Sequence, residues 1–291
     1  MEHYICSMDK HIGFFKELIG NYCLSDEATL QGYSHDETED IRVLPLCVLK
    51  PGTVDEVSKI LAYCNANQLL VTPMGARTGL SGGAIPAPGG VALSMERFNR
   101  ILAIDENNHQ VTTEPGVITQ VLQEAVKEKG LFYPPDPASK GSCFIGGNVS
   151  ENSGGPKAVK YGVTKDYVLN LEVVLPTGEI IWTGANTLKN STGYNLTQLM
   201  VGSEGTLGIV TKIVLKLLSK NTHNVLMLVP FYKANEACEA VSAIFRAGIV
   251  PSALEFMERD AIDWALEYID GLNVQVKTEI QAHLLIEVDG N

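Results

Sequence analysis

The sequence predicts a mixed α+β fold in two parts that meet near residue 220. The 291 residues are more than one hydrophobic core usually serves. Hydrophobic residues make up 45% of the chain and charged residues 19%, so there is ample material for packed cores and intrinsic disorder is excluded. Segments typical of strands and of amphipathic helices alternate along the chain, and glycine becomes sparse after Ser219.

Residues 1–40 are predicted to form an N-terminal helical segment. Its first 20 residues mix acidic, basic and apolar side chains at a spacing that suits an amphipathic helix and leaves no apolar block of the signal-peptide type. No stretch of the chain approaches the roughly 20 apolar residues of a membrane-spanning helix. The six cysteines include no C-x-x-C pair, which indicates reduced thiols. We therefore expect a cytoplasmic protein without a transmembrane segment.

Residues 41–220 form the second predicted region, which opens with a strand over 46–49. Thr53 and Glu56 have the spacing of a capping box and predict a helix through Asn67. Four apolar residues share one face of this helix: Val57, Ile60, Leu61 and Cys64. A buried strand over 69–72 is expected to end at Pro73. Further strands are predicted over 91–94, 101–104 and 110–113, and a helix over 119–129.

Two strands over 168–175 and 179–183 flank Pro176-Thr177-Gly178, which predicts a hairpin. A long alternating strand is predicted over 206–217. The third region, residues 221–291, is predicted to follow a β-α-β-α-β order, with strands over 223–230, 253–257 and 283–288 and helices over 235–247 and 261–269. That order is typical of the opening of a ferredoxin-like unit. We expect an incomplete substrate (cap) domain of this kind.

The charge of the chain limits the classes of partner. With 22 Lys and Arg against 34 Asp and Glu, the formal net charge is −12, which argues against nucleic acid as the main ligand. An anionic small molecule is not excluded, because backbone N–H groups can hold a phosphate without any excess of basic side chains.

Glycine marks three candidate binding segments. Of the 27 glycines, six lie in 75–90, six in 141–162 and three in 202–208. The first segment follows a predicted strand, and glycine there permits the backbone to turn its N–H groups toward a ligand. Its spacing is not G-x-G-x-x-G, prolines prevent the helix that a Rossmann turn opens, and no G-K-[ST] follows, so Rossmann and Walker sites are excluded. A complex turn remains the structural alternative.

The second segment runs from Pro134 through Gly162 and supplies small, polar and glycine residues that bring little apolar surface. Such a lining suits a large polar aromatic cofactor, and the alternative is a long surface loop, which is usually functional as well. The third segment, 201–209, enters the long predicted strand, and its alternative is a strand start with a bulge.

Together the three segments resemble the vanillyl-alcohol oxidase superfamily, also called the PCMH-type FAD-binding flavoproteins. The resemblance rests on 73–84, on 135–162 with its Ile-Gly-Gly-Asn and Lys-Tyr-Gly motifs, on 171–175 and on 202–210. Within the superfamily it is strongest toward glycolate oxidase FAD subunits, D-lactate dehydrogenases and D-2-hydroxyglutarate dehydrogenases. It implies a PCMH-type FAD-binding domain with two subdomains over 41–220.

The resemblance also implies the residues around FAD. The pyrophosphate would lie on the first loop, formed by Gly75, Ala76, Arg77, Thr78, Gly79, Leu80, Gly83 and Ala84. The adenosine and isoalloxazine would lie along Pro135, Asp136, Pro137, Ser142 and Cys143. The rest of the site would be lined by Gly146, Gly147, Asn148, Ser150, Asn152, Ser153, Gly155, Tyr161 and Gly162. The adenine side would be closed by Glu204, Gly208 and Ile209. Members with covalent flavin carry a histidine in the first loop, and this loop has none, so FAD is expected to be non-covalent.

The implied activity is oxidation of a small 2-hydroxy acid by hydride transfer to FAD, with electrons passing to a quinone, a cytochrome or a partner flavoprotein. The family's base and metal ligands lie in a C-terminal histidine-rich motif, and the six histidines of this sequence form no such cluster. We therefore expect no metal site, assign no catalytic residue, and interpret the chain as a C-terminally truncated member, with a partner chain or a homo-oligomer as possible assemblies. The alternatives are a non-catalytic FAD-binding or electron-transfer subunit and a flavin reductase of the cell-wall-precursor type.

Overall fold

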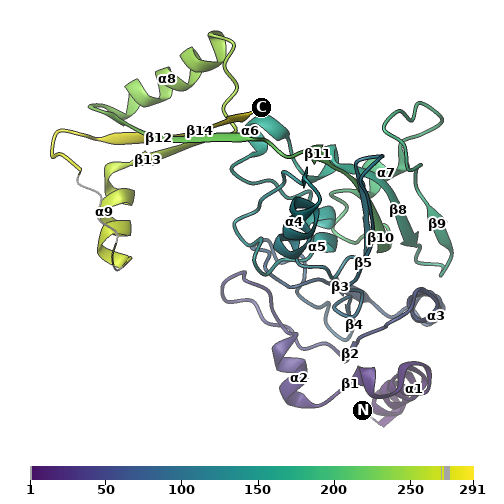
Figure 1. The fold of residues 1–291 in the computed structure, drawn as a ribbon. Coiled ribbons are helices and arrows are strands. Elements are labelled where there is room, and N and C mark those ends of the chain that lie inside the picture. Colours follow the sequence, from purple (N-terminus) through teal and green to yellow (C-terminus); the bar gives the residue numbers. More distant parts are fainter. Residues whose placement is uncertain (1, 270, 272–275) are drawn as a thin grey trace. The chain divides into compact units, whose positions relative to one another are not determined.

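The computed structural model describes residues 2–269, 271 and 276–291 (Figure 1). The chain forms two compact units, and each is described by itself. The first unit comprises Met1–Tyr133, Ala138–Ser153 and Thr164–Ser219. The second comprises Pro134–Pro137, Gly154–Val163 and Lys220–Asn291. None of the helices in the described ranges combines the length and apolar character that crossing a bilayer requires.

A four-stranded sheet forms one part of the first unit. Its order is β1 (Cys23–Leu24), β2 (Cys47–Leu49), β4 (Val91–Ser94) and β3 (Val71–Met74). Strands β2, β4 and β3 run parallel, and β1 pairs with β2 in the antiparallel sense. Helices α1 (Glu2–Ile19), α2 (Glu27–Gly32) and α3 (Val54–Ala66) belong to this part.

The start of α3 follows the predicted capping box. The Thr53 hydroxyl accepts the Glu56 N–H at 3.2 Å, and the Glu56 carboxylate accepts the Thr53 N–H at 3.2 Å. The four residues predicted to share a face are all buried. The predicted end of the neighbouring strand at Pro73 is wrong, because β3 continues to Met74. Proline is tolerated there because β3 is an edge strand that pairs on one side with β4.

A five-stranded antiparallel sheet forms the other part of the first unit. Its order is β5 (Ile101–Asp105), β6 (Gln110–Thr113), β10 (Ile209–Lys216), β8 (Val168–Val174) and β9 (Ile180–Trp182). The predicted β8–β9 hairpin is confirmed, with Gly178 at φ 89° in its turn. The predicted start of the long strand at 206 is wrong, since β10 begins at Ile209. Glu204 and Gly205 adopt left-handed φ values of 53° and 72°, which bend the preceding chain away from an extended path.

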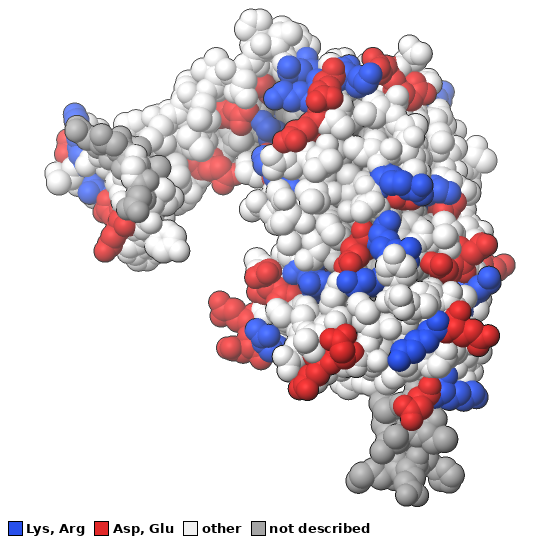
Figure 2. Space-filling model, turned by 60° about the horizontal axis from the view of Figure 1, so that its bottom comes forward, with Lys and Arg blue, Asp and Glu red and all other residues white. Residues whose placement is uncertain are grey.

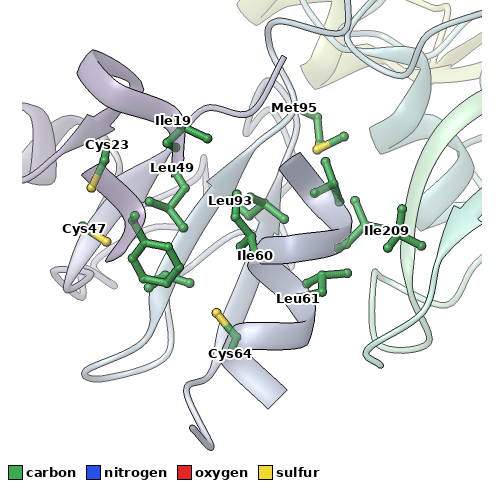
Figure 3. Close-up of a cluster of buried hydrophobic side chains, with 14 of the residues drawn as sticks. Ile19, Cys23, Cys47, Leu49, Ile60, Leu61, Cys64, Leu93, Met95 and Ile209 are labelled. Carbon is green, nitrogen blue, oxygen red and sulfur yellow. The ribbon is translucent and has the colours of Figure 1, made fainter. Parts of the chain in front are cut away.

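One hydrophobic cluster connects the two parts of the first unit (Figure 3). Side chains from α1, β2, α3 and β4 contribute most of it, and Val174 of β8 and Ile209 of β10 complete it. Leu49 and Ile60 at its centre have no exposed surface. The cluster therefore fixes the start of β10 at Ile209, where the third glycine-rich segment ends.

Several short elements were not predicted from the sequence. They are β1, the 3-10 turns Gly20–Tyr22 and Thr164–Asp166, β7 (Leu131–Phe132), α5 (Ile145–Glu151), α6 (Ala158–Tyr161), α7 (Leu196–Met200) and β11 (Leu218–Ser219). The predicted helix over 119–129 is α4 (Thr119–Glu128). The second glycine-rich segment is thus not one long loop but contains two helices.

The second unit contains all five elements predicted for 221–291. They are β12 (His223–Phe231), α8 (Ala234–Arg246), β13 (Ala253–Glu258), α9 (Arg259–Tyr268) and β14 (Ala282–Gly290). The sheet order is β12-β14-β13, with β14 antiparallel to both neighbours. A split β-α-β arrangement of this kind agrees with the expected ferredoxin-like order. Ala237 of α8 and Leu284 of β14 are buried in its hydrophobic core.

Candidate functional site

A pocket in the first unit is lined by all three glycine-rich segments. Its walls are formed by Asp36, Pro73, Met74, Gly75, Ala76, Arg77, Thr78, Gly79, Ser81, Gly83, Ala84, Met95, Pro115, Ser139, Cys143, Phe144, Gly146, Gly147, Asn148, Ser150, Glu151, Ser153, Glu204, Gly205, Gly208, Ile209 and Val210. Segments that lie more than 100 residues apart in the sequence therefore share one cavity.

The first segment leaves β3 at Met74 and forms an open loop. Arg77 and Gly82 adopt left-handed conformations, with φ of 59° and 77°, and turn the chain within a few residues. Within the described part of the chain, none of the N–H groups of residues 76–83 has a hydrogen-bond acceptor. A run of backbone donors beside a pocket is suited to an anion such as a pyrophosphate.

The second segment contributes the start of α5. Gly146 packs closely against Pro115, because its N–H donates to the Pro115 carbonyl at 2.7 Å and an added Cβ would lie 2.5 Å from the Pro115 Cβ. The next residue differs, since a Cβ on Gly147 would meet no atom within 4 Å. Gly147 therefore borders open space in the pocket, whereas Gly146 is a close-packing position.

The side chain of Asn148 supports the same wall from behind. It is buried, and its amide nitrogen donates to the Thr119 hydroxyl. That hydroxyl lies 3.3 Å from the Cys143 sulfur. Asn148 and Cys143 thus line the pocket and are also held by α4, which fixes the position of the wall.

The third segment joins the first two. The N–H groups of Gly202 and Glu204 donate to the carbonyls of Val149 at 2.9 Å and Ser150 at 3.0 Å on α5. Gly205 lies against Pro73, where an added Cβ would collide with the proline ring. The third segment therefore closes the pocket between β3 and α5.

The pocket contains three carboxylates beside one guanidinium. Burial raises the pKa of Glu151 above its usual value, and the nearby carboxylates of Glu204 and Asp36 raise it further. Arg77 lines the same cavity.

On the face of the molecule in Figure 2, acidic and basic side chains are interspersed.

The structure does not bring all of the predicted site residues to this pocket. Leu80, Ser142 and Asn152 belong to the first unit but are not among the lining residues. Six others belong to the second unit: Pro135, Asp136, Pro137, Gly155, Tyr161 and Gly162. Sequence reasoning missed Asp36 and Glu151, which line the pocket. Asp36 lies outside the three glycine-rich segments, and Glu151 lies within the second but was not singled out among its glycines, small residues and amides.

The second-unit members of that set contact each other and the last strand. A Cβ on Gly155 would collide with the Asp136 carbonyl oxygen, and the Lys157 N–H donates to the Asp136 carboxylate at 3.2 Å. Tyr161 donates to the Asp289 carboxylate. These contacts belong to the packing of the second unit.

The histidines in the described ranges are separate. No group of His, Cys, Asp and Glu there is arranged to hold a metal ion. His109 lies in the turn between β5 and β6 and has a left-handed φ of 50°. His283 is buried in β14, and burial lowers its pKa, with a smaller contribution from Arg259.

Comparison with protein families identifies two regions. Residues 45–184 match the family described as "FAD binding domain", and residues 220–291 match "FAD linked oxidases, C-terminal domain". The first match contains the whole of the first and second glycine-rich segments, which together supply most of the pocket wall.

Curated relatives are similar over most of this chain. The glycolate oxidase subunit GlcD of Bacillus subtilis is 45% identical over 258 residues, which are 89% of this chain and 54% of that protein. The D-lactate dehydrogenase of Anaerostipes hadrus is 40% identical over 95% of this chain and 59% of that protein. The D-2-hydroxyglutarate dehydrogenase of Xanthomonas citri is 38% identical over 84% of this chain and 52% of that protein. The chain therefore spans between about half and three fifths of the length of these relatives.

Solved structures support the fold. p-Cresol methylhydroxylase superposes with a TM-score of 0.81 at 20% identity, over 97% of this chain and 61% of that chain. Alkyldihydroxyacetonephosphate synthase gives a TM-score of 0.80 at 19% identity, over 97% and 56%. The fold is thus of the PCMH type, as the sequence predicted.

Proposed function

Because the chain belongs to the family of FAD-linked oxidases, we propose that it serves in the oxidation of a small 2-hydroxy acid, with non-covalent FAD in the pocket of the first unit. The observation that carries the placement is the donor set of the first loop. The N–H groups of residues 76–83 have no acceptor in the described part of the chain, and they border the same pocket as the open side of Gly147.

The residues of the pocket fit the parts of FAD. The free N–H groups of the first loop would hold the pyrophosphate, and Arg77 would neutralise part of its charge. The open space at Gly147 would admit the flat body of the cofactor against α5. Once bound, FAD supplies the acceptor for a hydride, and the chain supplies position, shielding from water and charge.

The substrate class is supported by the relatives. Glycolate, D-lactate and D-2-hydroxyglutarate, for which these relatives are named, share a hydroxyl on the carbon next to a carboxylate. We place the substrate of this chain in the same class. The name of the Bacillus subtilis relative includes the word subunit, so we also propose that a partner chain or a second copy assembles with this one.

The test uses the purified chain reconstituted with FAD. Glycolate, D-lactate, D-2-hydroxyglutarate and L-lactate are added separately without oxygen, and the flavin absorption is followed. Bleaching by one of the three proposed acids, and not by L-lactate, supports the function. Flavin colour that persists with all of them assigns the chain to FAD binding or electron transfer instead, and bleaching by NADPH alone indicates a reductase. A protein that takes up no flavin would refute the proposal.

The electron acceptor and the cellular location complete the proposal. The acceptor is a quinone, a cytochrome or a partner flavoprotein, which reoxidation of the bleached protein by each class would distinguish.

The location is the cytoplasm, which is supported by the free thiols of the five described cysteines. Cell fractionation tests it.

A further inference from the structure

The segment of residues 33–43, called here the clamp segment, contacts the first glycine loop. It connects α2 to β2 and precedes the part of the chain that matches the FAD-binding family. The Glu37 N–H donates to the Gly79 carbonyl at 3.1 Å, and the Val43 N–H donates to the Ser34 carbonyl at 2.8 Å. The clamp segment therefore contains an internal backbone hydrogen bond and is also hydrogen-bonded to the first glycine loop.

Asp36 attaches the clamp segment to the far end of that loop. Its side chain is buried, and its carboxylate accepts the Thr38 N–H at 2.9 Å and the Ala84 N–H at 3.4 Å. A buried carboxylate is costly unless hydrogen bonds compensate it, so these two bonds hold the clamp segment and Ala84 in place. The loop is thereby bonded at Gly79 and at Ala84.

Tyr33 supports Arg77 in the middle of the loop. The guanidinium carbon of Arg77 lies 4.2 Å from the centroid of the Tyr33 ring, which is the geometry of a cation–π contact. The Tyr33 hydroxyl donates to Glu96, and the Glu96 carboxylate also accepts from Lys50 at 2.8 Å. The ring is thus held from behind while its face contacts Arg77.

The backbone of Arg77 explains why such support matters. Its φ of 59° is a left-handed conformation that side chains other than glycine adopt at a cost, so it persists only where the surroundings favour it. Arg77 also lines the pocket. Loss of the ring contact would release both the guanidinium and the bend of the loop that carries the free N–H groups.

We propose that Tyr33 is a positioning residue for the FAD pyrophosphate: through Arg77 it holds the first glycine loop in the conformation that receives the phosphates. This rests on the proposed binding of FAD in this pocket. A loop that is ordered before binding loses less conformational entropy when the ligand arrives, so the affinity is higher. Loss of Tyr33 should therefore lower the affinity for FAD, which carries the phosphates, and leave the affinity for a flavin without phosphates unchanged.

The test compares FAD with riboflavin, which has the ring but no phosphate. Flavin-free wild-type, Tyr33→Leu and Tyr33→Phe proteins are titrated with each ligand, and quenching of flavin fluorescence gives the dissociation constants. Tyr33→Leu should bind FAD about threefold to thirtyfold more weakly, which is the range of one cation–π contact. Its riboflavin affinity should change less than twofold. Tyr33→Phe keeps the ring face and should restore most of the FAD affinity.

A second tyrosine provides a matched control. The Arg97 guanidinium lies 3.4 Å from the centroid of the Tyr22 ring, outside the pocket wall. Tyr22→Leu removes a similar contact and should leave FAD binding unchanged. If Tyr33→Leu binds FAD as well as wild type, or loses FAD and riboflavin equally, the positioning role is refuted. If wild type takes up no FAD, it is the proposed function that fails.

A double-mutant cycle tests whether Tyr33 acts through Arg77. Arg77→Gln should weaken FAD binding, and adding Tyr33→Leu to it should weaken binding no further, because the ring then contacts no cation of the pocket wall. Lys50, whose Nζ lies 4.9 Å from the centroid of the same ring, is not among the residues that line the pocket. Losses that multiply in the double variant would refute the coupling. Thermal unfolding of each flavin-free variant, followed by circular dichroism, identifies any variant that fails to fold, and Tyr33→Phe then carries the comparison.

Discussion

The Tyr161 hydroxyl donates to both carboxylate oxygens of Asp289, at 2.9 and 2.8 Å, and so fastens a short internal segment of the second unit to its last strand. Lys160 forms an ion pair with the same carboxylate, whose side chain is 4% exposed. A residue that the family resemblance placed at the cofactor thus also has a packing role within the second unit.

Asp289→Ala is expected to destabilise the second unit by about 2 kcal/mol at neutral pH, since it removes several charge-assisted hydrogen bonds. Burial acts to raise the pKa of Asp289, but the bonds from Lys160 and Tyr161 outweigh it and hold the pKa below its usual value. A lowered folded pKa gives stability that is present above the unfolded value of about 3.9 and is lost as the pH falls through the folded value. The deficit of the variant should therefore shrink below about pH 4.

Thermal unfolding between pH 3 and pH 8 measures this difference. Asp263 pairs with Arg259 one helical turn away on the surface of the same unit. Asp263→Ala is the control, and it should change stability by less than about 0.5 kcal/mol. A deficit of Asp289→Ala that is equal at pH 3 and pH 7 would contradict the electrostatic origin.

Gly147→Val should abolish FAD retention without loss of fold. The added side chain would enter open space in the pocket and meet no protein atom within 4 Å of its Cβ. Flavin content after gel filtration and the thermal midpoint are the two measurements. A Gly147→Val protein that stays yellow would show that FAD lies elsewhere.

Gly146→Ala, unlike Gly147→Val, is expected to destabilise the fold. Its Cβ would lie 2.5 Å from the Pro115 Cβ and 3.0 Å from the Pro115 carbonyl oxygen, so the fold must shift. Overpacking of this kind costs about 1–3 kcal/mol. The thermal midpoint should fall even without flavin, and an unchanged midpoint would argue against the position of α5.

FAD binding should weaken as the pH rises from about 5 to 8. The pKa of Glu151 is raised by burial, Glu204 and Asp36, and an incoming pyrophosphate adds negative charge that raises it further. Binding is then coupled to proton uptake, so it is favoured at low pH. Glu151→Gln should bind FAD several-fold more tightly at pH 8 and show a flatter pH profile. Dissociation constants for FAD, measured for both proteins across this pH range, test the prediction. An affinity that rises with pH would exclude coupling between FAD binding and proton uptake.

Cys143 should be protected from thiol reagents by FAD, because its side chain lines the pocket. Cys238 is exposed on α8 and serves as the internal control. Mass spectrometry after maleimide treatment should find Cys238 labelled with and without FAD, and Cys143 labelled more slowly when FAD is present. Equal labelling of Cys143 in both samples would place the cofactor away from this wall.

Local signals predicted much of the fold. The Thr53–Glu56 capping box located α3, and the Pro-Thr-Gly turn located the β8–β9 hairpin. Helix α5 escaped prediction because two glycines occupy its first turn, where intrinsic helix propensity is poor. It is held instead by tertiary contacts, since Ile145 is fully buried and its N–H donates to the Val117 carbonyl.

The candidate site was predictable where glycine marks it and hidden where contacts join distant residues. The clamp segment is acidic and has no glycine, so nothing local distinguishes it from a solvated loop. Lys157 and Lys160 pair with Glu287 and Asp289 about 130 residues later. Hydrophobic periodicity carries no information about such pairs, and the assignment of 154–163 to the second unit could not be anticipated.

The discontinuous make-up of the second unit limits how its gene could be recombined. A cassette cut at codon 220 would encode the sheet and both long helices but would separate Asp289 from Tyr161 and Lys160. A recombinant protein made in this way would contain the buried Asp289 carboxylate without the Lys160 ammonium that pairs with it. Exchange between homologues should therefore succeed only when the strip containing α6 travels with the carboxy-terminal half.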